Sequence, residues 1–337
     1  MARQIRIEFA GAFYHVMSRG NNGHKIFFGQ KGQESFMKVL DEACQRTGWI
    51  VHAYVLMGNH YHLLIETPEP NLVAGMKWLQ GTYTQRVNRW MKRKGHLFQG
   101  RYKAQVVNAD PMQSRYFQTV CDYIHLNPSR ARMIGKGKQW ETLKEYPWSS
   151  LPYYCKWETN RPKWLAVNKL LSTYSFKDNA VGRETYLKFL EAKGAETGKS
   201  YRELSRGWCL GDGNFKQKML DKAELVLAKN KRESNSGSIQ RDHAEGEASK
   251  LMLGSLMTLG IDSSDLPKMN KSAPEKKMIA ALLANRTLAS TQWIAEQLHM
   301  GHRSTVSQAK KWAKETKEGQ ERYNQLKSKL DDSQFTD

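Results

Sequence analysis

The chain has 337 residues, long enough for two or three domains rather than one. It carries 53 Lys and Arg against 33 Asp and Glu, a net charge of +20, and 39% of its residues are hydrophobic. The hydrophobic fraction allows a packed core and excludes collagen-like, coiled-coil-only and wholly disordered classes. The positive charge predicts a polyanionic partner, either nucleic acid or an anionic membrane surface.

Membrane insertion and secretion find no support in the sequence. No apolar run approaches the roughly 18 residues that a spanning helix needs, and the first residues, MARQIRIEFAG, lack the apolar core of a secretory signal. The four cysteines lie 34 or more residues apart and form no CxxC pair. We therefore expect no membrane contact, no disulfide framework and reduced thiols in the cytoplasm.

The first 130 residues alternate between strand-like and helix-like patterns. Strands are predicted at 13–17, 49–56, 60–66 and 101–108, and helices at 32–47, 71–94 and 111–127. The last helix is predicted to begin at Pro111 and to stop at Asn127, before Pro128. The order β-α-β-β-α-β-α predicts an α+β fold of the ferredoxin-like kind, a four-stranded sheet with helices on one face.

The remainder of the chain is predicted to be all-α. Apolar residues at helical spacings over 273–316 suggest a helix-turn-helix, with Arg303, Ser304, Thr305, Gln308 and Lys310 on the outer face of its last helix. The alternative is an ordinary three-helix bundle. The predicted divisions are a first domain at 1–150, a helical ancillary region at 151–228, a polar linker at 229–249, a helix-turn-helix-like DNA-binding domain at 250–316 and a frayed polar tail at 317–337.

Positive charge concentrates in one stretch, because no acidic residue occurs between Glu69 and Asp110. Aromatic residues are interleaved with its basic residues: Trp78, Tyr83, Trp90, Phe98 and Tyr102. A solvated helix face is the plain interpretation, but solvated faces usually mix charges of both signs. Backbone charge combined with base stacking is typical of single-stranded nucleic-acid binding, and we favour that interpretation.

Two short segments carry candidate chemistry. His60 and His62 are two residues apart on a predicted strand, so their imidazoles project from the same face and could chelate one divalent metal. The alternative is two polar residues on a solvated strand face. Tyr123 and Asn127 are four apart on a predicted helix and share one face. Tyr123 could instead be a core tyrosine, and Asn127 a helix cap.

Taken together, these residue types suit attack on a phosphodiester. A phenol has a pKa of about 10 and needs activation to act as a nucleophile at neutral pH. A metal at His60 and His62 would polarise the phosphate, and the amide oxygen of Asn127 could complete a three-ligand site. Mixed imidazole and amide-oxygen ligation suits Mg²⁺ or Mn²⁺.

The order of motifs resembles the REP-associated tyrosine transposases, within the HUH single-tyrosine transposase superfamily. The resemblance covers about residues 8–150. It rests on FYHVMSRG at 13–20, MGNHYHLL at 57–64, GHLFQGRYK at 95–103, YIHLNP at 123–128 and WSS at 148–150. It implies that His60 and His62 are metal ligands, that Asn127 is the third ligand, and that Tyr123 is the nucleophile. The reaction it implies is cleavage and rejoining of single-stranded DNA through a covalent 5′-phosphotyrosine.

The expected partner is DNA, as single strand, hairpin or repeat, with a homodimer left open and the bacterial cytoplasm, at the nucleoid, as the expected location. The candidate DNA contacts outside the last helix are basic residues: Arg19, Lys77, Arg86, Arg89, Lys92, Arg93, Lys94, Arg101, Lys103, Arg130 and Arg132. Two other functions compete with the transposase-like endonuclease and strand transferase. One is a DNA-binding regulator that does not cleave. The other is a metal-dependent hydrolase using water, for which Glu66 and Asp122 are the candidate bases.

Overall fold

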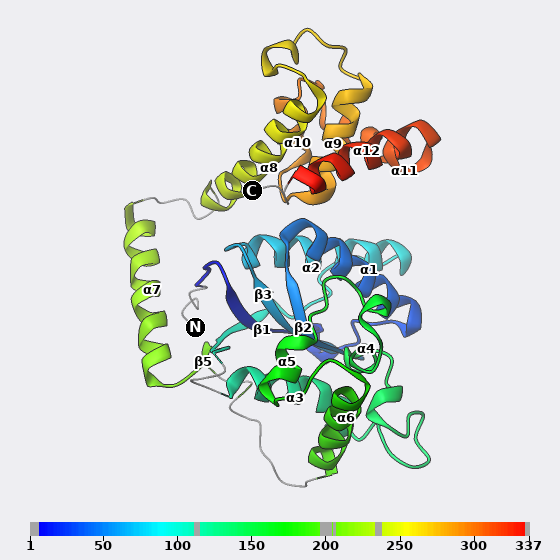
Figure 1. Cartoon of the computed structure of the whole chain (residues 1–337), viewed down its shortest axis with the longest axis vertical. Coiled ribbons are helices and arrows are strands. Elements are labelled where there is room, and N and C mark those ends of the chain that lie inside the picture. The colour runs from blue at the N-terminus through cyan, green and yellow to red at the C-terminus, as the bar shows by residue number, and fades with distance from the viewer. Residues whose placement is uncertain (1–6, 111–114, 196–203, 205–206, 233–237, 334–337) are drawn as a thin grey trace. The chain divides into compact units, whose positions relative to one another are not determined.

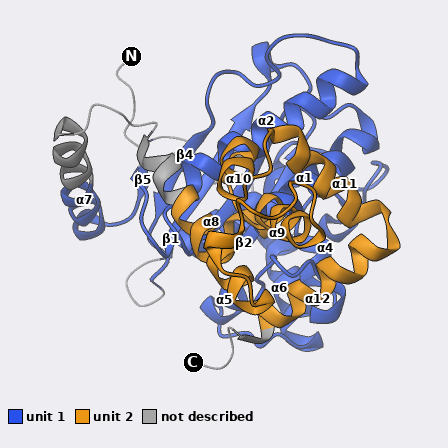
Figure 2. Cartoon of the chain, turned by 90° about the horizontal axis from the view of Figure 1, so that it is seen from above, with its two compact units in different colours: residues 1–44, 48–232 blue, residues 45–47, 233–337 orange. Residues whose placement is uncertain are grey.

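The computed structural model describes residues 7–110, 115–195, 204, 207–232 and 238–333. The chain divides into two compact units (Figure 2). The first comprises residues 1–44 and 48–232, and the second comprises residues 45–47 and 233–337. Each unit has its own hydrophobic core.

A five-stranded sheet forms the centre of the first unit. Its strands are β1 (Ala12–Arg19), β2 (Ile50–Met57), β3 (His60–Thr67), β4 (Lys103–Val107) and β5 (Cys209–Leu210). Their order across the sheet is β2-β3-β1-β4-β5, with antiparallel pairing except for the parallel pair β4–β5. Helices α1 (Gly29–Thr47) and α2 (Leu72–Trp90) connect the strands as predicted. The first four strands and these helices confirm the ferredoxin-like α+β fold.

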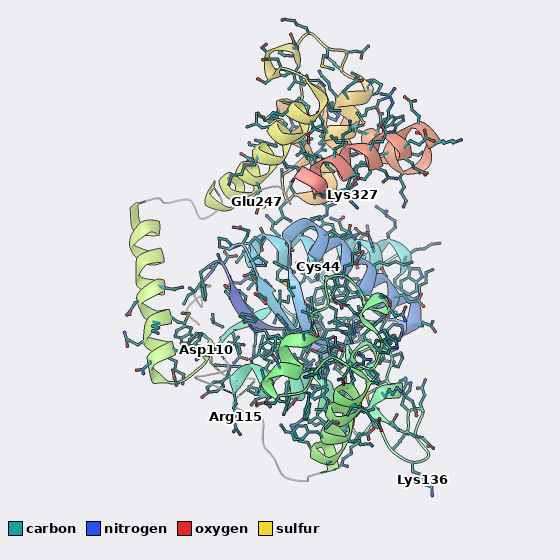
Figure 3. All side chains as sticks on the ribbon, in the orientation of Figure 1. Cys44, Asp110, Arg115, Lys136, Glu247 and Lys327 are labelled. Atoms are coloured by element: carbon teal, nitrogen blue, oxygen red, sulfur yellow. The ribbon has the colours of Figure 1, made fainter. Side chains whose placement is uncertain are left out.

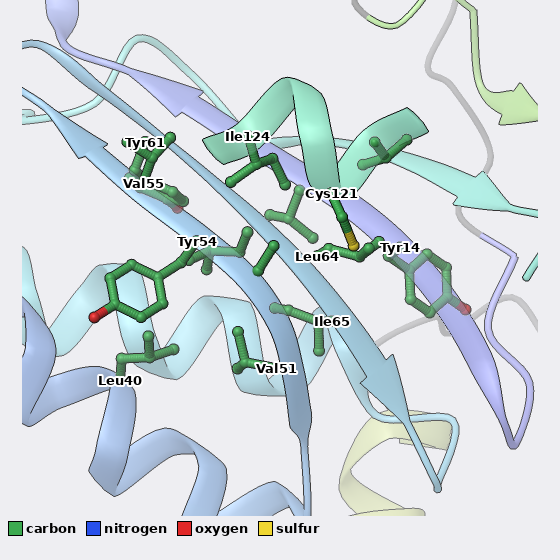
Figure 4. Close-up of a cluster of buried hydrophobic side chains, with 14 of the residues drawn as sticks. Tyr14, Leu40, Val51, Tyr54, Val55, Tyr61, Leu64, Ile65, Cys121 and Ile124 are labelled. Atoms are coloured by element: carbon green, nitrogen blue, oxygen red, sulfur yellow. The ribbon is translucent and has the colours of Figure 1, made fainter. Parts of the chain in front are cut away.

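Helices cover both faces of this sheet, whereas the sequence predicted helices on one face. Tyr61 on β3 contacts Phe36 of α1 and Gln80 of α2. The next residue, His62, points to the opposite face because strand side chains alternate, and there its ring contacts Tyr123 of α3 (Tyr116–Arg130). Figure 1 shows α3 on the side of the sheet away from α1 and α2. Both faces of β3 are therefore buried, and Figure 4 shows the apolar side chains that fill the two layers.

The end of α3 differs from its prediction. Pro128 lies inside the helix and does not stop it at Asn127. A proline removes only its own backbone N–H, and the N–H of Ala131 still donates to the Asn127 carbonyl at 2.9 Å. The helix therefore continues for most of a turn. The predicted start at Pro111 lies outside the described residues.

The segment after residue 150 packs onto the first unit. Its helices are α4 (Leu151–Tyr154), α5 (Asn168–Thr173), α6 (Ala180–Ala195) and α7 (Gly213–Arg232). Tyr186 and Leu190 of α6 are fully buried, and α6 packs against α3. Strand β5, which the sequence did not predict, extends the sheet beyond β4. Two residues are too few for a strand pattern to be visible in sequence.

The second unit is all-α, as predicted. It contains α8 (Ser238–Leu259), α9 (Pro274–Arg286), α10 (Thr291–Gln297), α11 (Arg303–Glu315) and α12 (Lys317–Ser333). Helices α9, α10 and α11 lie where the helix-turn-helix-like segment was predicted. Ser290 caps α10 by accepting a hydrogen bond from the backbone N–H of Trp293. None of the described helices is both long and apolar enough to span a bilayer.

Two polar segments are helical where irregular structure was predicted. Of the predicted linker, 229–232 ends α7 and 238–249 begins α8. Lys, Arg, Glu, Gln and Ala all favour helix, so a scarcity of apolar residues predicts exposure and not irregular structure. The predicted frayed tail forms α12, whose Tyr323, Leu326 and Leu330 follow helical spacing and pack into the core of this unit.

Replacing Leu326 by alanine should lower the free energy of unfolding of the second unit by about 2–5 kcal/mol, because it leaves a cavity at a residue that is 1% exposed. Chemical denaturation, monitored by the exchange of amide hydrogens in α9 and α12, measures this loss. Lys327→Ala, at the exposed neighbouring position, is the control and should change stability by less than about 0.5 kcal/mol. Equal stability of the two variants would show that α12 is not part of the core.

Candidate active site

The two histidines of β3 lie side by side on the sheet face that α3 covers. Their ring centres are 5.3 Å apart and the rings are perpendicular. His60 is the first residue of β3, directly after the Gly58–Asn59 turn, and is partly exposed, whereas His62 is buried. The pair therefore extends from the interior of the sheet to the end of β3.

Helix α3 brings Tyr123 to these histidines. The Tyr123 ring centre is 5.3 Å from that of His62, with the rings perpendicular, and the tyrosine is only partly buried. One turn later, the amide nitrogen of Asn127 donates to the Tyr123 carbonyl at 3.2 Å, and the Asn127 side chain also hydrogen-bonds His60. The four residues singled out in sequence thus come together from one strand and one helix.

Both imidazoles are in surroundings that favour the neutral ring. Burial lowers the pKa of His60, and the charge of Arg19 lowers it further against the opposing hydrogen bond with Asn127. Burial holds the pKa of His62 well below its usual value, helped by the neighbouring His15 and His60. Metals bind the neutral imidazole, so the pair suits a metal site. Among the described residues, no three His, Cys, Asp or Glu side chains gather at a common point.

Two arginines border the tyrosine and histidines. The guanidinium carbon of Arg130, an exposed residue, lies 5.6 Å from the centre of the Tyr123 ring. Arg19, also exposed, ends β1 directly opposite His60 in the strand register. Arg130 thus places positive charge beside the tyrosine, and Arg19 places it near His60. Arg132 is exposed just beyond the end of α3.

Neither carboxylate considered as a base for water attack lies beside the histidine pair. Glu66 is four residues from His62 along β3, about 13 Å at strand spacing. It accepts from His52 Nε2 at 2.8 Å instead. Asp122 is fully buried among groups from another part of the chain. These positions weigh against the water-using hydrolase.

Asp122 joins α3 to the segment that follows residue 170. Its carboxylate accepts a short hydrogen bond from the Tyr174 hydroxyl, one of 3.2 Å from Tyr186 and one of 2.7 Å from the Lys193 ammonium group. Burial raises the pKa of Asp122, against the lowering effect of Lys193. Because Asp122 precedes Tyr123, this cluster fixes the turn of α3 that carries the tyrosine.

His125 is a packing residue. It is fully buried, with Nδ1 3.0 Å from the Tyr186 hydroxyl and Nε2 2.7 Å from Ser150 Oγ.

His15 on β1 belongs to this site, although it was not among the residues predicted for it. It is fully buried, its ring stacks on that of His62 with centres 5.2 Å apart, and it lies 5.9 Å from the Tyr123 ring. Burial lowers its pKa to about 4. The available signals were its place in the FYHVMSRG motif and the alternation that puts His15 and Met17 on one face of a strand. Nothing in that pattern shows which strand lies alongside.

The basic stretch provides exposed charge but less stacking surface than predicted. Its exposed cations are Lys77, Arg89, Lys92, Lys94, Arg101 and Lys103. Arg86 instead forms an ion pair with Glu42 at 2.7 Å, and Arg93 lies near the Phe28 ring.

The stacking interpretation is wrong for three of the five aromatic residues in this stretch. Tyr83, Phe98 and Tyr102 are buried, because they form the apolar face of α2 and the loop packed against it. Trp78 and Trp90 are partly exposed.

The outer face of α11 is polar, as predicted. Val306 and Ala309 are buried in the core of the second unit. Arg303, Ser304 and Gln308 are exposed, and Thr305 and Lys310 are partly exposed.

Residues 9–127 match the family model described as "Transposase IS200 like". The match contains β1 to β4, His60, His62, Tyr123 and Asn127, so this part of the chain is similar to the IS200-like transposases, a transposase-like, DNA-processing class. The family resemblance predicted from the motifs is thereby confirmed.

The chain is also similar to a solved structure described as a REP-associated tyrosine transposase bound to a REP hairpin. The two share 15% sequence identity with a TM-score of 0.37, over 49% of this chain and 92% of the other. None of the curated proteins compared with the chain matches it.

Replacing Asp122 by alanine should lower the free energy of unfolding of the first unit by about 3 kcal/mol, because Lys193 and two tyrosine hydroxyls lose a buried acceptor. Urea denaturation measures this loss. Glu191→Ala, at an exposed carboxylate of α6, is the control and should be close to neutral. An Asp122→Ala protein as stable as the Glu191→Ala protein would show that the cluster does not hold α3.

Proposed function

We propose that the first unit cleaves and rejoins single-stranded DNA, with Tyr123 as the nucleophile. The observation that carries this proposal is the position of the Tyr123 ring, 5.3 Å from His62 and 5.6 Å from the Arg130 guanidinium, on a partly exposed surface. A regulator that does not cleave would not need this assembly. The family match supports the broader class, a DNA-processing transposase domain.

Tyrosine attack accounts for both cleavage and rejoining. A bond forms between Tyr123 Oη and phosphorus while the bond to the 3′-oxygen breaks, which leaves a 5′-phosphotyrosine and a free 3′-OH. The phosphotyrosine keeps the energy of the phosphodiester, so a 3′-OH can attack it and reseal a strand without another energy source. Arg130 and Arg19 would bind the non-bridging phosphate oxygens and orient the phosphorus toward Oη.

His60, His62 and Asn127 would hold Mg²⁺ or Mn²⁺. When bound, such an ion polarises the scissile phosphate as a Lewis acid. The neutral state of both rings and the amide side chain beside His60 support this role.

The substrate class follows from the surface around the tyrosine. Exposed cations on α2 and β4 suit a nucleic-acid backbone, and α3 carries no element that would separate a duplex. We therefore assign single-stranded or hairpin DNA as the substrate. A homodimer and a location at the bacterial nucleoid remain expectations.

The second unit is a candidate duplex-binding module. Ser304 and Gln308 lie on the exposed face of α11 beside Arg303, at the start of a helix preceded by a Met300–His302 turn. Short polar residues at this position suit base edges, and cations suit phosphates.

Replacing Tyr123 by phenylalanine should abolish the covalent DNA–protein adduct while leaving hairpin affinity within about 2-fold, since only the hydroxyl is lost. A denaturing gel with labelled hairpin DNA detects the adduct. Tyr116→Phe, seven residues earlier on α3, is the matched control and should form the adduct normally. An adduct that persists in Tyr123→Phe would exclude Tyr123 as the nucleophile.

Replacing Arg303 by glutamate should weaken binding to a hairpin with duplex flanks and lower the slope of log K against log salt by about 1, the loss of one phosphate contact. Titrations at several salt concentrations measure both effects. Lys327→Glu makes the same charge change on α12 of the same unit (Figure 3) and is the control. If both variants weaken binding equally, α11 is not a specific contact surface.

A further inference from the structure

A chain of hydrogen bonds runs from β4 through β1 to the histidine of β3. The Oε1 atom of Gln105 lies 3.2 Å from His15 Nδ1, and His15 Nε2 lies 3.0 Å from His62 Nδ1. All three residues are at most 6% exposed. The far end of the chain is anchored, because Gln105 Nε2 donates to the Gly207 carbonyl at 3.4 Å.

The strand register produces this chain. Gln105 pairs directly with His15 across β4 and β1. His15 pairs with Leu64 across β1 and β3, which makes His62 its diagonal neighbour on the same face. Diagonal neighbours are about 7–8 Å apart at Cα, within reach of two imidazole rings.

The chemistry of the partners determines where the hydrogens lie. An amide oxygen only accepts, so the Nδ1 of His15 must carry the hydrogen that Gln105 Oε1 receives. In the neutral ring, Nε2 of His15 then has a lone pair and accepts from Nδ1–H of His62. The remaining nitrogen of His62, Nε2, is left without a hydrogen.

The Gln105 amide disfavours the opposite arrangement. If His15 carried its hydrogen on Nε2, its Nδ1 lone pair would face the oxygen of Gln105 with no hydrogen between them. His62 would then carry its hydrogen on Nε2 and could not use that atom as a ligand. Turning the Gln105 amide over would break its bond to the Gly207 carbonyl, because two oxygens would face each other.

His60 has a shorter arrangement of the same kind. Its Nδ1 lies 2.7 Å from Asn59 Oδ1, and Asn59 Nδ2 donates to the Gly23 carbonyl at 3.0 Å. An anchored amide oxygen again favours the tautomer with hydrogen on Nδ1. The Asn127 side chain also hydrogen-bonds His60, so a cation at Nε2 would have to replace any hydrogen that this bond holds there. Both histidines of β3 thus have an amide that favours hydrogen on Nδ1, one through direct contact and one through His15.

We propose that His15 and Gln105 are positioning residues that hold His62 in the tautomer with a free Nε2, as Asn59 does for His60, so that both lone pairs are available to one divalent cation. This rests on the proposed metal role of the two histidines. Partners of this type are commonly as important to a metal site as the ligands, and their loss costs about 10–100-fold in metal affinity or activity.

The tautomers can be measured without metal or DNA. Long-range ¹H–¹⁵N spectra of the full-length, EDTA-treated protein, labelled with ¹⁵N at histidine, distinguish protonated from unprotonated ring nitrogens. We expect hydrogen on Nδ1 in His15, His60 and His62. In Gln105→Leu the His15 and His62 signals should change to mixed tautomers, while His60 stays unchanged as an internal control. Hydrogen on Nε2 of His62 in the unaltered protein would overturn the proposal.

Metal affinity provides the second measurement, with Mn²⁺ as the probe and electron paramagnetic resonance of free Mn²⁺ as the signal. His15→Leu should weaken Mn²⁺ binding by about 10–100-fold. His15→Gln, which returns an acceptor near the position of Nε2, should recover much of it. His52→Leu is the matched control, since His52 is equally buried on the same sheet face but bonds to Glu66.

If His15→Leu binds Mn²⁺ with wild-type affinity and has an unchanged circular dichroism spectrum, His15 is not a positioning residue. Failure of the proposed function has a different signature. In that case the unaltered protein shows the expected tautomers but does not bind Mn²⁺. This result would support the hydrogen-bond chain and exclude the metal role.

Discussion

The antiparallel pairing of β1 with β3 is the constraint on which the site depends. It sets His15 diagonal to His62 and Arg19 opposite His60, while β4 on the other side of β1 brings Gln105 to His15. A shift of one residue in this pairing would turn every β3 side chain to the opposite face, and the histidines would enter the apolar layer beneath α1 and α2. Tyr61, which bonds to Gln80 of α2, and Leu63 and Ile65, which are fully buried, resist such a shift. The apolar core therefore fixes the register, and the register assembles the polar chain.

The segment after residue 150 holds in place residues of the region that matches the family model. Tyr174, Tyr186 and Lys193 surround Asp122, and so determine the position of the α3 turn that carries Tyr123. Gly207 anchors Gln105, at the other end of the site. These contacts join residues 52 to 102 positions apart in sequence. The 119-residue match over 9–127 therefore contains the candidate site residues but lacks several of the groups that hold them in place.

Local spacing was enough to predict part of this molecule. Histidines two apart on a strand and a Tyr–Asn pair four apart on a helix share a face by geometry alone, and the motif order supplied the association between strand and helix. His15, Gln105 and Asp122 could not be assigned in this way, because their roles depend on strand register and on distant segments. For the aromatic residues of α2, sequence spacing predicted a role that the structure does not support. Tyr83 lies among cations in sequence, yet its ring is in the core and its hydroxyl donates to the Ile26 carbonyl.

The distribution of charge explains why the site can receive a polyanion. The carboxylates nearest to it in sequence are engaged elsewhere, Glu66 with His52 and Asp122 with Lys193. The groups that orient the histidines are amides and a neutral imidazole, which direct hydrogens without adding negative charge. A carboxylate in place of the Gln105 amide would orient His15 equally well, but it would bring a buried anion toward the place where a phosphate has to bind. The neutral partners inside the sheet and the arginines at its surface are thus both consistent with the proposed function, because they orient the histidines without adding negative charge and leave positive charge around the tyrosine.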